Sequence, residues 1–226
     1  MSAFPCSPVD PIILSMAKAL RIEVVSDVIC PWCFIGTMNL EKALALRPDV
    51  AAEVVFQPFL LDPTTPPEGA DLRERLRTKY GADPEAMFAR VESVARAAGI
   101  ELDFKKVRRT PNTRRAHVLL EHVQDASKRA KLAKALFAAY FLEGKDISDV
   151  DVLVSLAKDH GQDDATVRAL LTDEGELAKI QVAAAEQASR GIRGVPFFVF
   201  NDRLGVSGAQ PPEILCQAMD QALAGG

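Results

Sequence analysis

The stretch VVSDVICPWCFIGTMNLEKAL, residues 24–44, decides how the chain folds. It opens with a run of β-branched residues, typical of a strand, that leads directly into Cys30 and Cys33. Beyond the two cysteines, apolar residues recur at the spacing of one helix face as far as Leu44, and Pro48 stops the pattern. The stretch therefore predicts a strand followed at once by a helix, with the two cysteines at the junction.

A second strand is predicted by EVVFQPFLLDP, residues 53–63. Pro58 cannot donate a hydrogen bond to a neighbouring strand, so we expect an edge strand or a bend there. Strand, helix and strand in this order predict a βαβ unit, in which the crossover makes the two strands parallel.

Between about residues 69 and 172 the pattern changes to that of amphipathic helices. The first begins at Asp83, a favoured N-cap residue, and carries Met87, Val91 and Val94 on one face. Four more helical patterns follow, at residues 112–123, 127–144, 148–161 and 163–172. No run in this segment predicts a strand, so we expect a compact helical bundle.

The last part of the chain returns to mixed structure. Residues 175–191 predict a long helix, and residues 195–209 predict two short strands around a turn at Asn201 and Asp202. A terminal amphipathic helix follows in residues 210–226. The two ends of the chain thus predict an α/β layer into which the helical segment is inserted.

The composition is that of a globular protein. The 226 residues are 48% apolar and 26% charged, and a net charge of −4 gives no reason to expect nucleic acid or an anionic membrane as partner. Prolines and an acid interrupt the first twenty residues, so we expect a disordered leader over residues 1–18, with Met16 as an alternative start, and no signal peptide. No apolar run approaches the length of a membrane helix, and we therefore expect a soluble, cytoplasmic protein.

The placement of the cysteine pair predicts redox chemistry. A helix N-terminus has unpaired N–H groups and a partial positive charge, so it favours the thiolate of Cys30. Pro31 fits the first helical turn, where its missing N–H has no acceptor to lose. Cys33 lies one turn further in, close enough to bond Cys30. We expect Cys30 to attack and Cys33 to resolve the resulting mixed disulfide.

Two other interpretations of the pair stay open. A zinc site would need two more ligands, and the chain has no second Cys-x-x-Cys, while His117 and His122 are spaced for different helix faces. Two inert buried cysteines are the other alternative. The strand–cysteine–helix context favours the redox interpretation over both, and we expect no metal.

SDVICPWCFIG at residues 26–36, followed by GVPFFVFNDRLGVSGAQPPE at residues 194–213, resembles the DsbA-like thioredoxin-fold oxidoreductases. The chain is most similar to their FrnE-like branch, and the resemblance extends from about residue 21 to near the end. It implies that the peptide bond between Val195 and Pro196 is cis and faces the cysteine pair. The backbone of Val195 would then be free to pair with an extended substrate beside the site.

The resemblance also implies the domain organisation. The fold class is α/β: a thioredoxin fold with an inserted all-helical domain. Residues 19–68 and 174–226 would form the discontinuous thioredoxin-like domain, and residues 69–173 the insertion.

Further candidate residues come with the family. The segment TPNTRRAH, residues 110–117, resembles a stretch that lies over the redox site, so Asn112, Thr113 and His117 are candidates to line a substrate groove. Helix capping by Asn112 or Thr113 is the alternative.

The two residues between the cysteines are Pro31 and Trp32, where periplasmic DsbA proteins carry Pro-His. The absence of that histidine removes a potential cation beside Cys30. Trp32 instead offers an apolar lip for an unfolded peptide, or a packing surface for the helical domain. We expect Cys216 to be a buried core thiol and assign no role to Cys6.

These features predict a thiol–disulfide oxidoreductase that forms a mixed disulfide through Cys30. Its partners would be protein thiols and disulfides or glutathione, with no bound cofactor. One alternative is a glutathione-dependent transferase or isomerase of the kappa-class type, which shares the insertion architecture. The other is a non-enzymatic accessory role, for which Cys30 would be dispensable.

Overall fold

The computed structural model describes residues 18–225, and a four-stranded sheet forms its centre. The strand order is β2–β1–β5–β6, with β1 at Lys18–Ser26, β2 at Val50–Pro58, β5 at Phe197–Phe200 and β6 at Leu204–Ser207. Strands β1 and β2 are parallel, whereas β5 runs antiparallel to β1 and to β6. The predicted βαβ unit is confirmed, and β2 is an edge strand that ends at Pro58, as its proline indicated.

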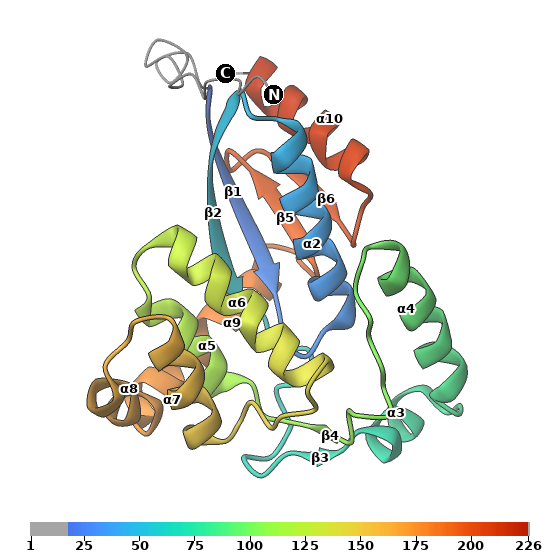
Figure 1. Cartoon of the computed structure of the whole chain (residues 1–226), viewed down its shortest axis with the longest axis vertical. Helices are drawn as coiled ribbons and strands as arrows, with labels where there is room; N and C mark the ends of the chain where they lie inside the picture. Colours follow the sequence, from blue (N-terminus) through green and yellow to red (C-terminus); the bar gives the residue numbers. More distant parts are fainter. Residues whose placement is uncertain (1–17, 226) are drawn as a thin grey trace, which may run out of the picture.

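Four helices pack against this sheet or against each other beside it. Helix α2 (Pro31–Leu46) and helix α10 (Pro212–Ala224) contact each other, and α10 contacts β1, β5 and β6. Helix α6 (Ala126–Phe141) and helix α9 (Glu174–Ser189) contact β2. Figure 1 shows α2 and α10 together along one side of the sheet, and α6 near the end at which β1 and β2 finish. The predicted α/β fold is confirmed.

The middle of the chain is helical, with one small exception. Its remaining helices are α3 (Leu72–Tyr80), α4 (Glu85–Ala97), α5 (Arg114–His122), α7 (Val150–Asp159) and α8 (Asp164–Leu171). The expectation of no strands there is wrong, because β3 (Ala70–Asp71) pairs antiparallel with β4 (Arg109–Thr110). Two residues per strand are too few to produce a recognisable alternation in the sequence.

Aspartate side chains begin most of these helices. Each accepts a hydrogen bond from a backbone N–H of the first turn, which is otherwise unpaired, and such a cap is worth about 1 kcal/mol. The capping residues are Asp71, Asp125, Asp149, Asp163 and Asp173.

Helix α4 buries a different face from the predicted one. Its buried residues are Phe88, Val91 and Ala95, whereas Met87 and Val94 are 39% and 37% exposed. The ring of Phe88 stacks on that of Phe104 with 4.2 Å between centroids, and this contact rotates the buried face by one residue. Pro84, not Asp83, occupies the N-cap position.

The predicted hairpin between β5 and β6 is confirmed. Asn201 and Asp202 both have positive φ, at 47° and 57°, which is the backbone conformation of the tight turns that join antiparallel strands. Asn201 also fixes the turn to the sheet, because its side chain accepts a hydrogen bond from the N–H of Arg21 on β1 at 2.9 Å.

The predicted leader, with Cys6 and Met16, lies almost entirely outside the described residues. Helix α9 contacts both β2 and α5, so it touches the sheet as well as the helical segment, and the predicted domain boundaries stay a prediction.

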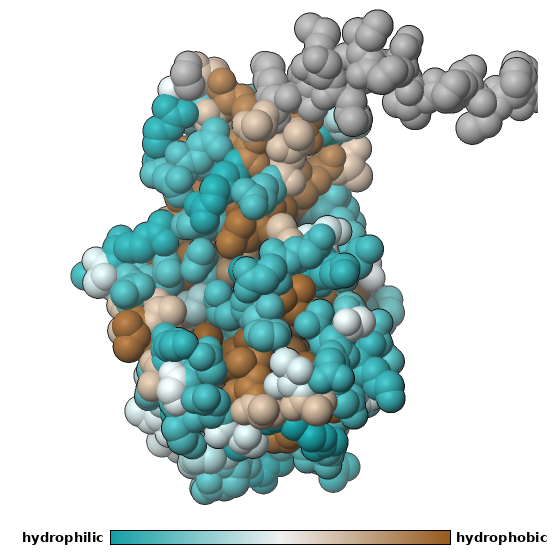
Figure 2. Space-filling model, turned by 90° about the vertical axis from the view of Figure 1, so that its left-hand side faces the viewer, coloured by the Kyte–Doolittle hydropathy of each residue, from teal (hydrophilic) through white to brown (hydrophobic). Residues whose placement is uncertain are grey.

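Figure 2 shows a mostly hydrophilic face broken by small apolar patches. Within residues 18–225, no helix combines the length and apolarity needed to cross a membrane.

Candidate active site

The cysteine pair lies at the start of α2, as predicted. Cys30 occupies the N-cap position with an extended backbone, and Pro31 begins the helix. The carbonyl of Cys30 accepts the N–H groups of Cys33 and Phe34, which closes the first turn. Its sulfur therefore lies where the partial positive charge of the helix is greatest.

The peptide bond between Val195 and Pro196 is cis, as the resemblance implied, and it faces the pair. The Sγ of Cys30 donates to the carbonyl oxygen of Val195 at 3.6 Å. A contact between residues 165 positions apart thus joins the first helix of the fold to the loop before β5. The sulfur of Cys30 thus lies beside the Val195–Pro196 peptide.

The exposed fractions of the two thiols differ little, although an attacking Cys30 should be more accessible than a resolving Cys33. Cys30 is only 3% exposed and Cys33 is fully buried. What distinguishes them is that Cys30 lines a cavity and Cys33 does not. Burial, followed by the hydrogen bond to Cys30, raises the pKa of the Cys33 thiol well above its usual range. Cys33 therefore holds its proton firmly.

A buried carboxylate close to the cysteine pair, that of Asp27, was not predicted from the sequence. Asp27 has no exposed surface, accepts the N–H of Leu61 at 2.8 Å and lies 3.4 Å from Nε2 of His117. Its negative charge contributes to the raised pKa of Cys33, while a hydrogen bond from its backbone acts in the opposite sense. An acidic residue between the apolar run of β1 and the cysteine pair was the signal that could have identified it.

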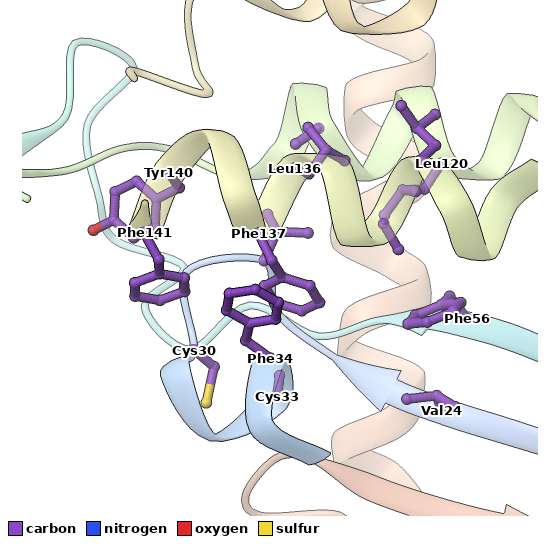
Figure 3. Close-up of a cluster of buried hydrophobic side chains, with 14 of the residues drawn as sticks. Val24, Cys30, Cys33, Phe34, Phe56, Leu120, Leu136, Phe137, Tyr140 and Phe141 are labelled. Atoms are coloured by element: carbon purple, nitrogen blue, oxygen red, sulfur yellow. The ribbon is translucent and has the colours of Figure 1, made fainter. Parts of the chain in front are cut away.

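Aromatic side chains of α6 cover the first turns of α2. The ring of Phe34 stacks on that of Phe137 with 5.2 Å between centroids and lies 6.1 Å from that of Phe141. Figure 3 shows Phe137 and Phe141 pointing from α6 toward α2 and Phe34 pointing from α2 toward α6, with Phe141 beside Cys30. This packing fixes the redox pair against the helical segment.

Gly36 allows α2 to approach the cis-proline loop. A Cβ at this position would lie 2.9 Å from Cγ of Pro196 and 3.2 Å from the ring of Phe198. Since both neighbours belong to buried residues, a side chain there would push the loop away from α2.

We predict that Gly36→Ala costs about 1–3 kcal/mol of stability, as overpacking does, and slows exchange at Cys30 by moving Pro196. Denaturant unfolding and the rate of reaction with a model disulfide measure the two effects. Unchanged values of both would show that this contact does not position the loop.

A cavity of about 280 Å³ lies beside Cys30, between the start of α2 and the helix pair α3–α4. Pro31, Trp32 and Val195, all predicted to bind substrate, line it together with Cys30. The contribution of α3 and α4 was not foreseen, because their lining residues come from the part of the sequence assigned only to a bundle. These include Leu72, Arg75, Leu76, Lys79, Tyr80, Met87, Phe88 and Val91.

Asn112, Thr113 and His117 are not among the residues that line this cavity. Asn112 instead donates to the carbonyl of Thr65 at 2.7 Å and accepts the N–H of Arg114, which resembles the capping alternative. Thr113 is buried at the start of α5, and His117 is buried against Asp27. The inward face of α5 packs in the core, so it cannot form the wall of a groove.

Cys216 is half-buried, so the prediction of a buried core thiol is only partly met. Its neighbours Leu215 and Met219 are buried, but Ile214 is 41% exposed. Its Sγ lies 3.6 Å from the carbonyl oxygen of Ala43, and burial raises the pKa of its thiol. Ala43 is thirteen residues along α2 from Cys30, or about 20 Å at 1.5 Å per residue, so Cys216 is remote from the site.

Over the described part of the chain, no group of three or more His, Cys, Asp or Glu side chains could hold a metal ion.

The chain matches the family model of the DSBA-like thioredoxin domain over residues 21–220. It is 34% identical to a probable DsbA oxidoreductase of Streptomyces coelicolor, whose crystal structure superposes with a TM-score of 0.82 and a coverage of 91% of this chain and 90% of that one. It is also 27% identical to the uncharacterized protein YwbO of Bacillus subtilis, covering 88% of this chain and 96% of YwbO.

A putative protein disulfide isomerase of Nitrosomonas europaea is 18% identical, with a TM-score of 0.72 and a coverage of 92% and 99%, which shows a shared fold. The family match spans most of the chain and includes both the cysteine pair and the cis-proline loop. The chain therefore belongs to the DSBA-like thioredoxin domain family.

Proposed function

We propose that this protein catalyses thiol–disulfide exchange through a mixed disulfide at Cys30. The observation that carries the proposal is the position of the Cys30 sulfur, at the N-terminus of α2, in a cavity wall and beside the Val195–Pro196 loop. Cys33 lies one turn behind it with no exposed surface. This arrangement supports one attacking and one resolving thiol.

The exchange takes two steps. The Cys30 thiolate attacks one sulfur of a partner disulfide, forms a mixed disulfide and releases the other sulfur as a thiolate. Cys33 then loses its proton, and its sulfur attacks Cys30 and releases the second partner thiolate. The protein becomes a disulfide while the partner is reduced, and the reverse sequence oxidises a partner dithiol.

The second step requires a proton to leave a buried thiol whose pKa is raised. Asp27, buried beneath the pair and held by Leu61 and His117, is the carboxylate whose charge reaches Cys33. We infer that Asp27 assists this deprotonation, as a general base acts on a nearby group.

Protein segments are the partners that the Val195 loop favours. Among the residues described, none accepts a hydrogen bond from the backbone N–H of Val195. This N–H is therefore available to pair with an extended chain that brings its cysteine to Cys30. We propose protein thiols and disulfides, with glutathione as a further redox partner, and a cytoplasmic location. Membership of the FrnE-like branch stays a prediction.

The glutathione-dependent transferase or isomerase is a second candidate because an apolar cavity beside the Cys30 thiol could hold a small acceptor. The two functions differ in their need for Cys33. Exchange needs it for turnover, whereas a transferase that activates bound glutathione does not.

The test is an equilibrium with graded mixtures of reduced and oxidised glutathione, followed by acid quenching and mass mapping of the cysteines. We expect a reversible disulfide between Cys30 and Cys33 with a defined midpoint. A pair that stays reduced throughout, or a Cys30 that only gathers glutathione, would contradict exchange and favour the glutathione-dependent candidate.

A further inference from the structure

The cavity beside Cys30 offers a route to its sulfur. Cys30 is 3% exposed, and the cavity wall includes it. A reacting sulfur that approaches through this cavity brings with it the group that carries it. The chemistry of the remaining wall decides which groups enter favourably.

Most of that wall is apolar. Trp32 comes from α2, Leu76 from α3, Met87 and Phe88 from α4, and Phe141 from α6, so four helices contribute. Met87 is 39% exposed although it is a large apolar residue, and the face that it shares with Val94 is not the one that α4 buries in the core. A ligand with an apolar body would cover this exposed surface and be stabilised by its removal from water.

The charged residues of the wall leave a net positive charge. They are Asp62, Arg75 and Lys79. Arg75 is neutralised by Asp62 through an ion pair of 2.5 Å, and its hydrogen bond holds the pKa of that carboxyl below its usual range. Lys79 has no carboxylate partner within residues 18–225, and its ammonium lies 5.6 Å from the centre of the Tyr80 ring. One unneutralised cation at an apolar cavity favours an anion on the ligand.

We propose that this cavity binds a low-molecular-weight thiol or disulfide that has an apolar, ring-sized body and one carboxylate. The proposal rests on the proposed exchange at Cys30 and names a further redox partner for it, besides glutathione and protein segments at Val195. The volume of about 280 Å³ lies just below the range of about 300–1,000 Å³ typical of small-molecule sites, which suits one ring and its substituents.

The ligand takes part in the exchange as follows. The Cys30 thiolate attacks the nearer sulfur of the bound disulfide, the disulfide bond of the ligand breaks, and its outer half leaves as a thiolate. The Cys33 sulfur, after losing its proton, then attacks Cys30 and releases the inner half as a second thiolate. Two electrons pass from the protein dithiol to the ligand, and the reverse reaction oxidises two ligand thiols.

Binding can be tested apart from exchange in the Cys30→Ser protein. The probe is 4-(methylsulfanyl)benzoate, a thioether that cannot exchange, and its neutral counterpart is 4-(methylsulfanyl)benzamide. Trp32 is the single tryptophan of the chain and lines the cavity, so its fluorescence reports occupancy. We expect saturable binding of the benzoate and weaker binding of the benzamide.

Two pairs of variants locate the site. Met87→Asp should weaken binding of the benzoate at least about tenfold by placing a charge in the apolar wall. Val94→Asp should leave binding of the benzoate unchanged, because Val94 lies two turns along the same face of α4, is 37% exposed and is outside the cavity wall.

Lys79→Glu should weaken binding of the benzoate up to about fivefold, as expected of an exposed ion pair, and should leave binding of the benzamide unchanged. Lys158→Glu, also an exposed lysine in the last turn of its helix, is its control.

The outcomes separate this inference from the proposed function. Absent or non-saturable binding, equal effects of Met87→Asp and Val94→Asp, or tighter binding of S-methylglutathione than of the benzoate would overturn the ligand class while exchange with proteins stands. Saturable binding in the Cys30→Ser protein, together with an unaltered protein whose Cys30 and Cys33 stay reduced in every glutathione mixture, would support the cavity as a binding site and overturn the redox role.

Discussion

Cys30→Ser is expected to abolish thiol–disulfide exchange, whereas Cys33→Ser is expected to trap the reaction halfway. Among the cysteines of the described residues, Cys30 alone lines the cavity, so its loss removes the attacking sulfur. Without Cys33 the first step still occurs, but no thiol lies behind Cys30 to release the partner, and a mixed disulfide accumulates. Intact mass spectra, recorded after mixing each reduced variant with oxidised glutathione, distinguish the two results.

Cys216→Ser is the control for these variants. The Cys216 thiol is only half-buried, but it lies on α10, beside Ala43 and far along α2 from Cys30. It should exchange at the rate of the unaltered protein. Comparable exchange by Cys30→Ser would contradict the assigned roles and favour the accessory function. A Cys33→Ser protein that carries no adduct at Cys30 would contradict the order of attack and resolution.

Phe137→Ala is expected to give the largest loss of stability, about 3–5 kcal/mol of the free energy of unfolding. The Phe137 side chain has no exposed surface and stacks on Phe34, so its removal leaves a cavity between α6 and α2. For a chain of this length the Tm should fall by roughly 10 °C. Calorimetry and denaturant unfolding provide the measurement.

Leu46→Ala serves as the comparison, since Leu46 lies at the end of α2 and is 62% exposed. Its effect should stay within about 0.5 kcal/mol, as for other surface substitutions. Similar losses for Phe137→Ala and Leu46→Ala would show that the aromatic contact does not hold α6 to α2.

The parts of the fold that follow from neighbouring residues could be predicted from the sequence. The cysteines at a strand–helix junction, the proline that ends an edge strand and the Asn201–Asp202 turn each rest on the conformational preferences of a few adjacent residues. The cis bond at Pro196 came only from resemblance to a family, because an isolated proline does not determine its isomer.

Other features depend on contacts between distant segments and were therefore missed. The buried face of α4 is set by the stacking of Phe88 on Phe104, and either of two adjacent stripes fits its sequence. His117 resembled a groove residue, but the buried Asp27, directly after β1, holds it in the core. The cavity itself arises where four helices meet, and no local pattern encodes such a junction.

The sequence distance between the two halves of the site affects how the chain acquires activity. Strand β5, which follows Val195, pairs with β1, so residues such as Ile22 and Phe200 must meet across the whole helical segment. Contacts this far apart in sequence form slowly, and during synthesis the cysteines emerge long before their partner loop. A newly made chain thus carries its thiols through most of translation without the surroundings that give them selectivity. Competent exchange appears only when nearly the entire polypeptide has folded.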